Sequence, residues 1–178
     1  MTQPEIKKPY TSFLLIKLVI FTIAVPGSIT GWIPLYWLFP WLRRSITPNH
    51  WWQALASALI LIGAWGYFWC GLDFVFRGQG TPAPFDPPKV LVVHGLYKHT
   101  RNPMYLSVLT VLVGEYVLFH SAIFLEYVVL VALGFFLFVM LYEEPALTRK
   151  MGAAYEQYCE EVPRWIPRLA PRRAKNAL

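Results

Sequence analysis

Three charged residues at the two ends of one long apolar stretch carry most of the chemistry that this sequence offers. Arg101 belongs to a first polar segment, His94–Tyr105, while Glu143 and Glu144 open a second one, Glu143–Arg168. Two neighbouring carboxylates at the end of an apolar helix are unfavourable unless they are solvated or paired. They are therefore either an exposed pair at the water boundary or a pair that faces Arg101 and binds hydroxyl or ammonium groups of a ligand. Neighbouring helical residues point about 100° apart, so one carboxylate is expected to face such a ligand.

The stretch between the two polar segments determines where they meet. It consists almost entirely of Leu, Val, Phe, Tyr and Ala, and it is long enough to cross a bilayer and return. A hairpin of two membrane helices brings both polar segments to the same surface. The sequence therefore predicts a polar pocket at the membrane boundary, which suits chemistry on a molecule that resides in lipid.

The composition favours membrane-spanning helices over a soluble core. The chain has 178 residues, 56% of them hydrophobic, and apolar runs of roughly 18 residues or more are typical of transmembrane helices. Apolar runs lie near Phe13–Phe39, Trp51–Phe76, Met104–Phe119 and Ala122–Tyr142, of which the third is short. Pro26 and Gly27 interrupt the first run, which is either one kinked span or a span followed by an interfacial segment. We expect an all-α membrane protein with about four transmembrane helices, or five as the alternative.

The whole chain, residues 1–178, is expected to form a single membrane domain. Its N-terminal spans occupy residues 13–76, and residues 80–168 form the half that carries both polar segments. Pro145 cannot donate a backbone hydrogen bond, so the last span should kink or break there. Beyond it, apolar and aromatic residues recur at helical spacing in Leu147, Met151, Tyr155 and Tyr158. This stripe predicts an amphipathic C-terminal helix at the cytoplasmic surface.

The net charge of +6 reflects membrane orientation rather than binding of nucleic acid. With four spans and a cytoplasmic N-terminus, almost every Lys and Arg of the connecting segments lies on the cytoplasmic side. Only Arg43 and Arg44 lie on the opposite side of the membrane. This is the positive-inside bias of membrane proteins. It predicts a protein of the inner membrane with both termini in the cytoplasm. No small-residue cleavage site follows the first apolar run, which is expected to be retained as a span.

Two further features lie directly before the first polar segment and near its end. The loop Arg77–Lys89 contains too much Pro and Gly to form a helix, and it is either a linker or a strap over the pocket. Its position directly before the polar segment favours the strap. Asn102 and Pro103 predict a helix start with Asn102 as the N-cap. The positive end of that helix favours an anion.

The remaining polar residues are weaker candidates. Glu115 and Glu126 lie within apolar runs, far from the polar segments, and are interpreted as structural or interface residues. The four histidines have no spacing that forms a metal-binding set, so no metal is expected. Cys70 and Cys159 form no disulfide framework and are interpreted as packing residues.

Short motifs around the hairpin resemble those of a known family. The sequence contains Gly95-Leu96-Tyr97, Arg101-Asn102-Pro103-Met104-Tyr105, the hairpin, Glu143-Glu144-Pro145-Ala146-Leu147, and Tyr155 to Tyr158. In this order they resemble the G-x-Y, R-H-P-x-Y, E-E-x-x-L and Y-x-x-Y motifs of the isoprenylcysteine carboxyl methyltransferases and related phospholipid N-methyltransferases. The resemblance covers residues 80–168, whereas the first half is similar to the family only in being membrane helices.

The resemblance implies a membrane methyltransferase that uses S-adenosylmethionine, enclosed near the cytoplasmic face. The cofactor-binding residues that it implies are Lys89, Val90, Leu91, Val92, Tyr97, Asn102, Pro103, Met104, Tyr105 and Glu143. Two positions depart from the family pattern. Asn102 replaces a His, and Val139 stands where the prenylcysteine enzymes carry an Arg that meets the substrate carboxylate.

Arg101 and Glu144 are the catalytic candidates. Methyl transfer from a sulfonium is an in-line displacement, which depends on alignment and on exclusion of water. Arg101 would orient an anionic substrate or fix the glutamate pair, and Glu144 would help an amine to lose its proton. We expect methylation of a small or lipidic acceptor (a carboxylate, amine or thiol) that enters from the bilayer. Membrane lipids are the other expected partners, and neither nucleic acid nor metal is expected.

Two other functions stay open from the sequence alone. An NADPH-dependent sterol or lipid reductase is similar to this family in its C-terminal half. It would need a nucleotide phosphate site, for which only scattered Lys and Arg residues are present. A non-catalytic membrane carrier would show polar residues through the spans to the far side, and Glu115 and Glu126 alone make no such path.

Overall fold

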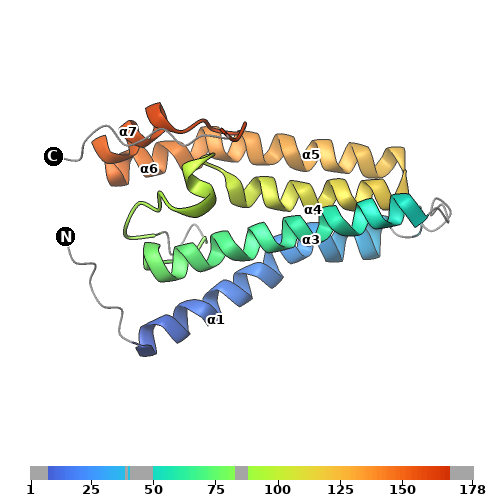
Figure 1. Ribbon diagram of the computed structural model, residues 1–178, viewed down its shortest axis with the longest axis horizontal. Coiled ribbons are helices and arrows are strands. Elements are labelled where there is room, and N and C mark those ends of the chain that lie inside the picture. Colours follow the sequence, from blue (N-terminus) through green and yellow to red (C-terminus); the bar gives the residue numbers. More distant parts are fainter. Residues whose placement is uncertain (1–7, 39, 41–49, 83–87, 169–178) are drawn as a thin grey trace.

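Four long helices run side by side along the molecule (Figure 1). They are α1 (Lys8–Ala24), α3 (His50–Asp73), α4 (Pro103–Phe119) and α5 (Ala122–Phe138). The computed structural model describes residues 8–38, 40, 50–82 and 88–168, and these residues include no β-strand. The expected all-α fold is therefore confirmed for the part of the chain that is described.

The lengths of the helices identify an integral membrane protein. Three continuous helical segments are long and apolar enough to cross a membrane: Thr11–Tyr36, His50–Gly78 and Ala122–Met151. Helix α4 is a shorter apolar helix of 17 residues, about 25 Å long at 1.5 Å per residue. That length approaches the roughly 30 Å of a bilayer core. Three spanning helices and the shorter α4 within the described residues agree with the predicted number of about four.

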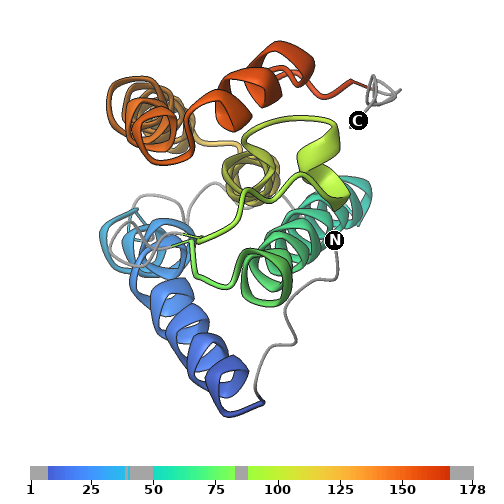
Figure 2. The same ribbon diagram turned by 90° about the vertical axis from the view of Figure 1, so that its left-hand side faces the viewer.

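The four helices alternate in direction, so two of them start and two of them end at each end of the bundle (Figure 1). Helices α1 and α4 begin at one end, where α3 and α5 finish; this is named the pocket end below. The loop that precedes α4 and the short helices that follow α5 gather at the pocket end, as seen from that side in Figure 2.

The first span is a single bent helix, one of the two interpretations left open above. Beyond Ala24 the chain continues through Pro26 into two π-helical turns, η1 (Ser28–Trp32) and η2 (Pro34–Leu38). The wide turns leave backbone groups in need of partners, and the Tyr127 hydroxyl of α5 donates to the Ile29 carbonyl at 2.7 Å. The first half of α1 diverges from the other helices at the pocket end (Figures 1 and 2).

Helices α3 and α4 pack so closely that their interface requires glycine. A Cβ atom on Gly63 would lie 2.6 Å from the Ser107 carbonyl oxygen, and one on Gly114 would lie 2.9 Å from the Ala56 carbonyl oxygen. Small residues allow membrane helices to approach and to gain the packing energy on which their association in lipid depends. The tightly packed α3–α4 interface holds the first turn of α4 in place, where the first polar segment ends.

Helix α5 continues into the second polar segment without the break that Pro145 led us to expect. One π-helical turn, η5 (Val139–Glu143), joins α5 to α6 (Glu144–Met151). In this turn the Glu144 amide donates to the Val139 carbonyl. A π-turn spaces its hydrogen bonds one residue further apart than an α-turn does. The wider turn directly before Pro145 thus accommodates the missing backbone donor.

The C-terminal stripe predicted from the sequence lies on two short helices rather than on one. Gly152, with φ of 57°, separates α6 from α7 (Ala153–Glu161). The stripe packs against the loop before α4, in a cluster formed by Tyr155, Tyr158 and Val162 with Leu91, Val93, Leu147, Met151 and Cys159. This cluster joins the two polar segments at the pocket end.

Candidate functional site

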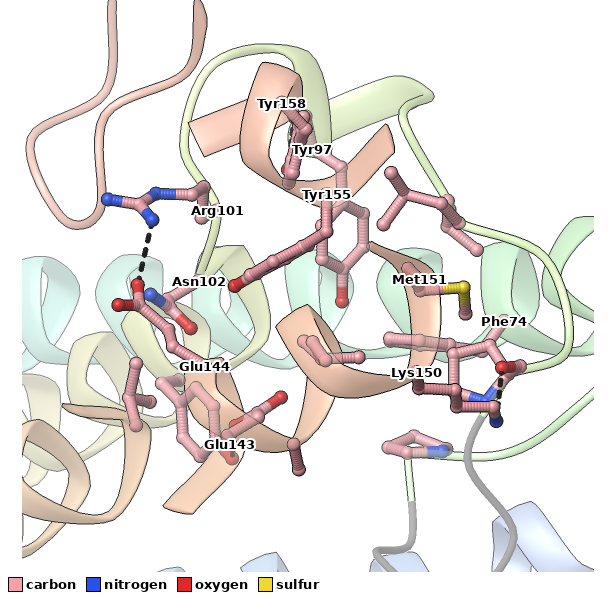
Figure 3. A pocket seen from close by; sticks show the side chains of 18 of the residues that line it. Phe74, Tyr97, Arg101, Asn102, Glu143, Glu144, Lys150, Met151, Tyr155 and Tyr158 are labelled. Atoms are coloured by element: carbon pink, nitrogen blue, oxygen red, sulfur yellow. Dashed lines mark hydrogen bonds and ion pairs between the residues drawn. The ribbon is translucent and has the colours of Figure 1, made fainter. Parts of the chain in front are cut away.

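A cavity lies at the pocket end, between the loop before α4, the first turn of α4, and the helices η5, α6 and α7 (Figure 3). It contains about 980 Å³ of empty space, open solvent included. Aromatic and aliphatic side chains form most of its wall. The charged and amide groups among them are Arg101, Asn102, Glu143, Glu144 and Lys150. Both polar segments therefore contribute to one pocket.

Most of the residues singled out in the sequence line this cavity. They are Leu91, Val92, Tyr97, Arg101, Asn102, Tyr105, Glu143 and Glu144. The glycine of the first motif explains how Tyr97 arrives there. Gly95 has φ of 55°, and a Cβ atom on it would lie 2.7 Å from Asp73 Oδ2 at the end of α3. The loop can therefore turn tightly against α3, and η4 (Gly95–Lys98) directs the buried Tyr97 ring inwards.

Four of the predicted cofactor residues lie outside the cavity. Lys89 and Val90 have exposed side chains, and their amides bind the Gly78 carbonyl, which ties the loop to the end of the second span. Pro103 and Met104 are buried in the bundle. Side chains one helical turn apart share a face, and here that face carries Asn102 and Tyr105 of the same motif. Met104 reaches only the adjoining pocket described below.

Asn102 occupies the predicted N-cap position of α4, but its side chain does not cap the helix. Its Nδ2 donates instead to the Arg164 carbonyl at 3.0 Å. Asn102 is 6% exposed, so this buried amide is committed to the chain that follows α7. The sequence motif located the helix start and missed this partner, which lies 62 residues further along the chain.

Glu144 is held between two arginines. Arg164 Nε donates to its Oε1 at 2.9 Å and Arg164 Nη2 donates to its Oε2 at 2.7 Å. Arg101 Nη1 lies 2.9 Å from the same Oε1 (Figure 3). The hydrogen bonds to Glu144 raise the pKa of the Arg164 guanidinium. The bidentate pair and the second arginine together fix this carboxylate in one orientation.

Arg101, which lines the cavity, keeps one buried donor unpaired within the described part of the chain. Its Nη1 also donates to Cys159 Sγ at 2.8 Å. Its Nε is buried and has no hydrogen-bond partner among the described residues. A buried donor on a charged group is costly to leave unpaired, so this atom is suited to an acceptor that a ligand brings.

Glu143, the other carboxylate of the pair, contacts α4 instead of the arginines. The Tyr105 hydroxyl donates to Glu143 Oε2 at 2.6 Å, a short bond of the kind made to a charged acceptor. The two neighbouring carboxylates contact different partners, although both residues line the cavity. Glu143 faces the hairpin and Glu144 faces the C-terminal chain.

Three buried tyrosines form the aromatic wall. Tyr97, Tyr155 and Tyr158 line the cavity (Figure 3), and the Tyr158 hydroxyl donates to the Tyr97 carbonyl at 2.8 Å. Burial raises the pKa of all three phenols above their ordinary value. They therefore remain neutral at physiological pH and offer aromatic faces and hydroxyl groups rather than charge.

The loop Arg77–Lys89 contributes to the cavity at both of its described ends. Thr81, Pro82 and Pro88 line it, and Lys150 Nζ of α6 donates to the Pro88 carbonyl at 2.9 Å. Residues 83–87 lie outside the described residues. The strap interpretation of the whole loop therefore stays a prediction.

A second pocket adjoins the cavity deeper in the bundle. Its wall includes Phe21, Val25, Pro26 and Ile29 of the first span, together with Tyr67, Val108 and Phe135. The two pockets share Phe74, Pro82, Tyr97, Arg101, Asn102, Tyr105 and Glu143. The two pockets thus meet at these shared residues. The rest of the second pocket's wall is apolar apart from Tyr67, whereas Glu144 and Lys150 line the first cavity alone.

Several lining residues were missed or interpreted only as packing. Tyr155, Tyr158, Leu147 and Met151 both pack together and face the cavity. Phe138, Val139 and Tyr142 enter the wall from the end of the last span. The helical spacing of Leu147, Met151, Tyr155 and Tyr158 in the second polar segment could have indicated that they face the cavity. The roles of Phe74 and Arg164 had no local signal, because each depends on a partner far away in the sequence.

No group of three or more His, Cys, Asp or Glu side chains within the described residues is arranged to hold a metal ion. Glu115 lies away from both pockets, and its Oε2 is buried without a partner among the described residues.

Fold and site define the class of protein: an integral membrane protein with a polar, tyrosine-walled cavity at one end of its bundle. The model of one protein family, phospholipid methyltransferase, matches residues 51–154, from the start of α3 into α7. The chain belongs to the phospholipid methyltransferase family. Comparison with curated proteins and with solved structures gives no match. The family supports methyl transfer over the reductase and carrier alternatives, and it confirms the resemblance seen in the motifs.

Proposed function

We propose that this protein is an S-adenosylmethionine-dependent methyltransferase that acts on a lipidic acceptor reached from the bilayer. One observation carries the proposal: the polar cavity at the pocket end and the apolar pocket between the spans meet at a common set of residues. An enzyme that transfers a group from a polar donor to a lipid needs such an arrangement. Each compartment offers one reactant its own environment, and the junction brings the reacting groups together.

The groups in the cavity fit the charged parts of S-adenosylmethionine. The cofactor's amino acid portion carries an ammonium and a carboxylate. Glu143 provides a carboxylate for the ammonium, and the unpartnered Arg101 Nε provides a donor for the carboxylate. Phe74 and Tyr97, whose rings meet edge to face at 5.4 Å, provide aromatic surface for the adenine. When bound, the cofactor supplies a methyl group on a positively charged sulfur.

The apolar pocket fits the hydrocarbon part of an acceptor. Its walls from the first span, including Phe21, Val25 and Ile29, lie within a segment that is long and apolar enough to cross a membrane. A lipid chain placed there would stay in an apolar environment while its headgroup reached the junction. Val139, in the cavity wall, provides no charge for a substrate carboxylate at the position where the prenylcysteine enzymes carry Arg.

The residues at the junction position the binding groups and align the reactants, and they form no covalent bond with either reactant. Tyr105 fixes Glu143 by its 2.6 Å hydrogen bond, and Glu144 fixes Arg101 by the ion pair at 2.9 Å. Glu144 is ion-paired with two arginines, so we assign it this orienting role in place of proton removal from an amine. Alignment and exclusion of water are the contributions that an in-line displacement requires.

The pocket end is proposed to face the cytoplasm. Lys98, Arg149, Lys150 and Arg164 lie in its loop and short helices, and basic residues at one end of the spans follow the positive-inside bias. The cofactor would then enter from the cytoplasmic side and the lipid from the membrane.

Transfer of radiolabel from the methyl group of S-adenosylmethionine to lipid tests the proposal. The purified protein is incubated in detergent with a membrane lipid extract, and label is measured in the organic phase. We expect transfer by the wild-type protein. Because hydrogen bonds to charged groups contribute about 1.5–3 kcal/mol, Glu143→Gln should weaken cofactor binding roughly 10- to 100-fold.

Glu126→Gln is the matched control, because Glu126 is exposed on α5 and lines neither pocket. It should bind cofactor and transfer label as the wild-type protein does. Wild-type protein that neither binds S-adenosylmethionine by calorimetry nor labels any lipid would overturn the proposed function.

A further inference from the structure

The chain that follows α7 folds back against the first polar segment. Residues 163–168, which lie beyond the family match, run beside residues 99–102 at the start of α4. Their backbone contacts are Arg101 N to Pro163 O at 2.9 Å and Arg168 N to His99 O at 3.0 Å. Two side chains of the first polar segment, Thr100 Oγ1 and Asn102 Nδ2, each donate to Arg164 O at 3.0 Å. The 163–168 segment is therefore bound along its length to the motif that carries Arg101.

Two side chains of the 163–168 segment reach the residues of the cavity. Arg164 makes the bidentate pair with Glu144, at 2.9 and 2.7 Å. The Trp165 ring lies 6.5 Å from the Tyr105 ring and 6.3 Å from the Phe136 ring, measured between centroids. Trp165 thus supports the tyrosine that binds Glu143, while Arg164 holds Glu144.

The charges of this group show what Arg164 contributes. Arg101 and Arg164 together carry two positive charges against the single negative charge of Glu144. Because Arg164 occupies both oxygens of Glu144, Arg101 contacts only one of them, and its buried Nε has no hydrogen-bond partner among the described residues. Without Arg164, Glu144 would face Arg101 as its only cation in this group. The positive charge of Arg101 would then be cancelled, and its guanidinium would be free to turn towards both carboxylate oxygens.

We propose that the 163–168 segment completes the cofactor site, with Arg164 as a positioning residue that keeps Arg101 available to an anionic group of the ligand. The inference rests on the proposed function, since the ligand is taken to be S-adenosylmethionine and its carboxylate the anionic group. Arg164 itself lines neither pocket. It acts through Glu144 and Arg101.

The test is the binding of S-adenosylmethionine to purified protein in detergent, measured by calorimetry for the wild type and for Arg164→Ala. We expect the dissociation constant to rise at least tenfold in Arg164→Ala. In methyl-transfer assays KM for the cofactor should rise by a similar factor while kcat at saturating cofactor changes less than threefold, as expected when binding is weakened equally in ground and transition states. Arg164→Lys keeps the charge but not the two-pronged geometry, so it should recover part of the affinity.

Arg149→Ala is the charge-matched control. Arg149 is exposed on α6, and its Nε donates to the Pro145 carbonyl rather than to either glutamate. Its loss removes one positive charge from the same end of the protein and should leave the dissociation constant unchanged. If Arg164→Ala loses its fold on heating below the assay temperature, the comparison is made between Arg164→Lys and the wild type. A weaker affinity at unchanged thermal stability supports the positioning role.

The outcomes separate the inference from the function on which it rests. A wild-type protein that binds no S-adenosylmethionine overturns both. A wild-type protein that binds it, together with Arg164→Ala or Arg164→Lys variants of wild-type affinity, overturns the positioning role alone. An equal loss of affinity in Arg149→Ala would also overturn it, because the effect would then come from general charge.

Discussion

At the scale of single residues, the hydroxyl of Tyr105 is the contact that fixes Glu143 in the cavity, through the 2.6 Å bond to Oε2. Tyr105→Phe removes this donor and leaves the ring that packs beside Phe135 at 4.9 Å between centroids. A hydrogen bond to a charged group contributes about 1.5–3 kcal/mol. Cofactor affinity should therefore fall about tenfold or more, measured by calorimetry in detergent.

Tyr116→Phe is the control for this substitution. Tyr116 lies on the same helix at the end far from the cavity and lines neither pocket, so its variant should bind cofactor normally. Unchanged affinity in Tyr105→Phe would show that Glu143 is oriented by its backbone alone, and it would remove Tyr105 from the proposed binding set.

Residue types and spacing predicted which side chains would be important more readily than they predicted their partners. Arg101, Glu143 and Glu144 were identified as a group because charge at the end of an apolar span needs a reason. Which glutamate faces Arg101 was not decided by the sequence. It depends on Arg164, which reaches Glu144 only because the chain folds back after α7. Asn102 shows the same limit, since its amide serves a backbone carbonyl of that returning chain.

At the scale of elements, the contact between α3 and α4 holds the first turn of α4 in place. Gly63→Ala puts a Cβ atom 2.6 Å from the Ser107 carbonyl oxygen and 2.8 Å from the Val111 amide nitrogen. Overpacking of this kind costs typically 1–3 kcal/mol. The midpoint of thermal unfolding in detergent should therefore fall in Gly63→Ala.

Gly134→Ala provides the comparison within α5. A Cβ atom on Gly134 meets nothing within 4 Å, and Ala is favoured over Gly in a helix by about 1 kcal/mol. Its unfolding midpoint should stay or rise. If both alanine variants unfold alike, the close approach of α3 and α4 is not what stabilises the bundle.

The positions of the elements were well predicted from apolar length, whereas their internal geometry was not. Proline at positions 26 and 145 was expected to kink or interrupt spans. The chain bends at Pro26 but passes Pro145 through the π-turn η5. Hydropathy cannot distinguish these outcomes, because they depend on local backbone hydrogen bonding. The Ile29 carbonyl, whose donor in the π-turn register would be Pro34, accepts from the Tyr127 hydroxyl instead. The split of the C-terminal stripe at Gly152 depends likewise on packing against the loop before α4.

At the scale of the whole molecule, the hairpin of α4 and α5 is what joins two distant polar segments into one site. This was predictable, since an apolar stretch that crosses a membrane twice must return to the side where it began. The apolar pocket beside the cavity was not, because it requires the bend of the first span to place Pro26 and Ile29 near Phe135. The half of the chain that carries both polar segments, residues 80–168, therefore does not build the site alone. The first span contributes the wall on which a lipidic acceptor would rest.

The arrangement of the bundle makes a direct prediction about sidedness. Lys98 in η4 and Ala154 in α7 are exposed at the pocket end, and Ala122 is exposed at the opposite end of α4 and α5. Single cysteines are introduced as Lys98→Cys, Ala154→Cys and Ala122→Cys in a Cys159→Ser background, which leaves only the fully buried Cys70.

A membrane-impermeant maleimide should label Ala122→Cys in intact cells. It should label Lys98→Cys and Ala154→Cys only after the membrane is opened, because the positive-inside bias favours a cytoplasmic position for the basic pocket end. The reverse pattern would keep the four crossings but put the cofactor cavity on the wrong side for a cytoplasmic cofactor. Labelling of all three from one side would show that α4 and α5 do not cross, and the shared junction of donor and lipid would lose its basis.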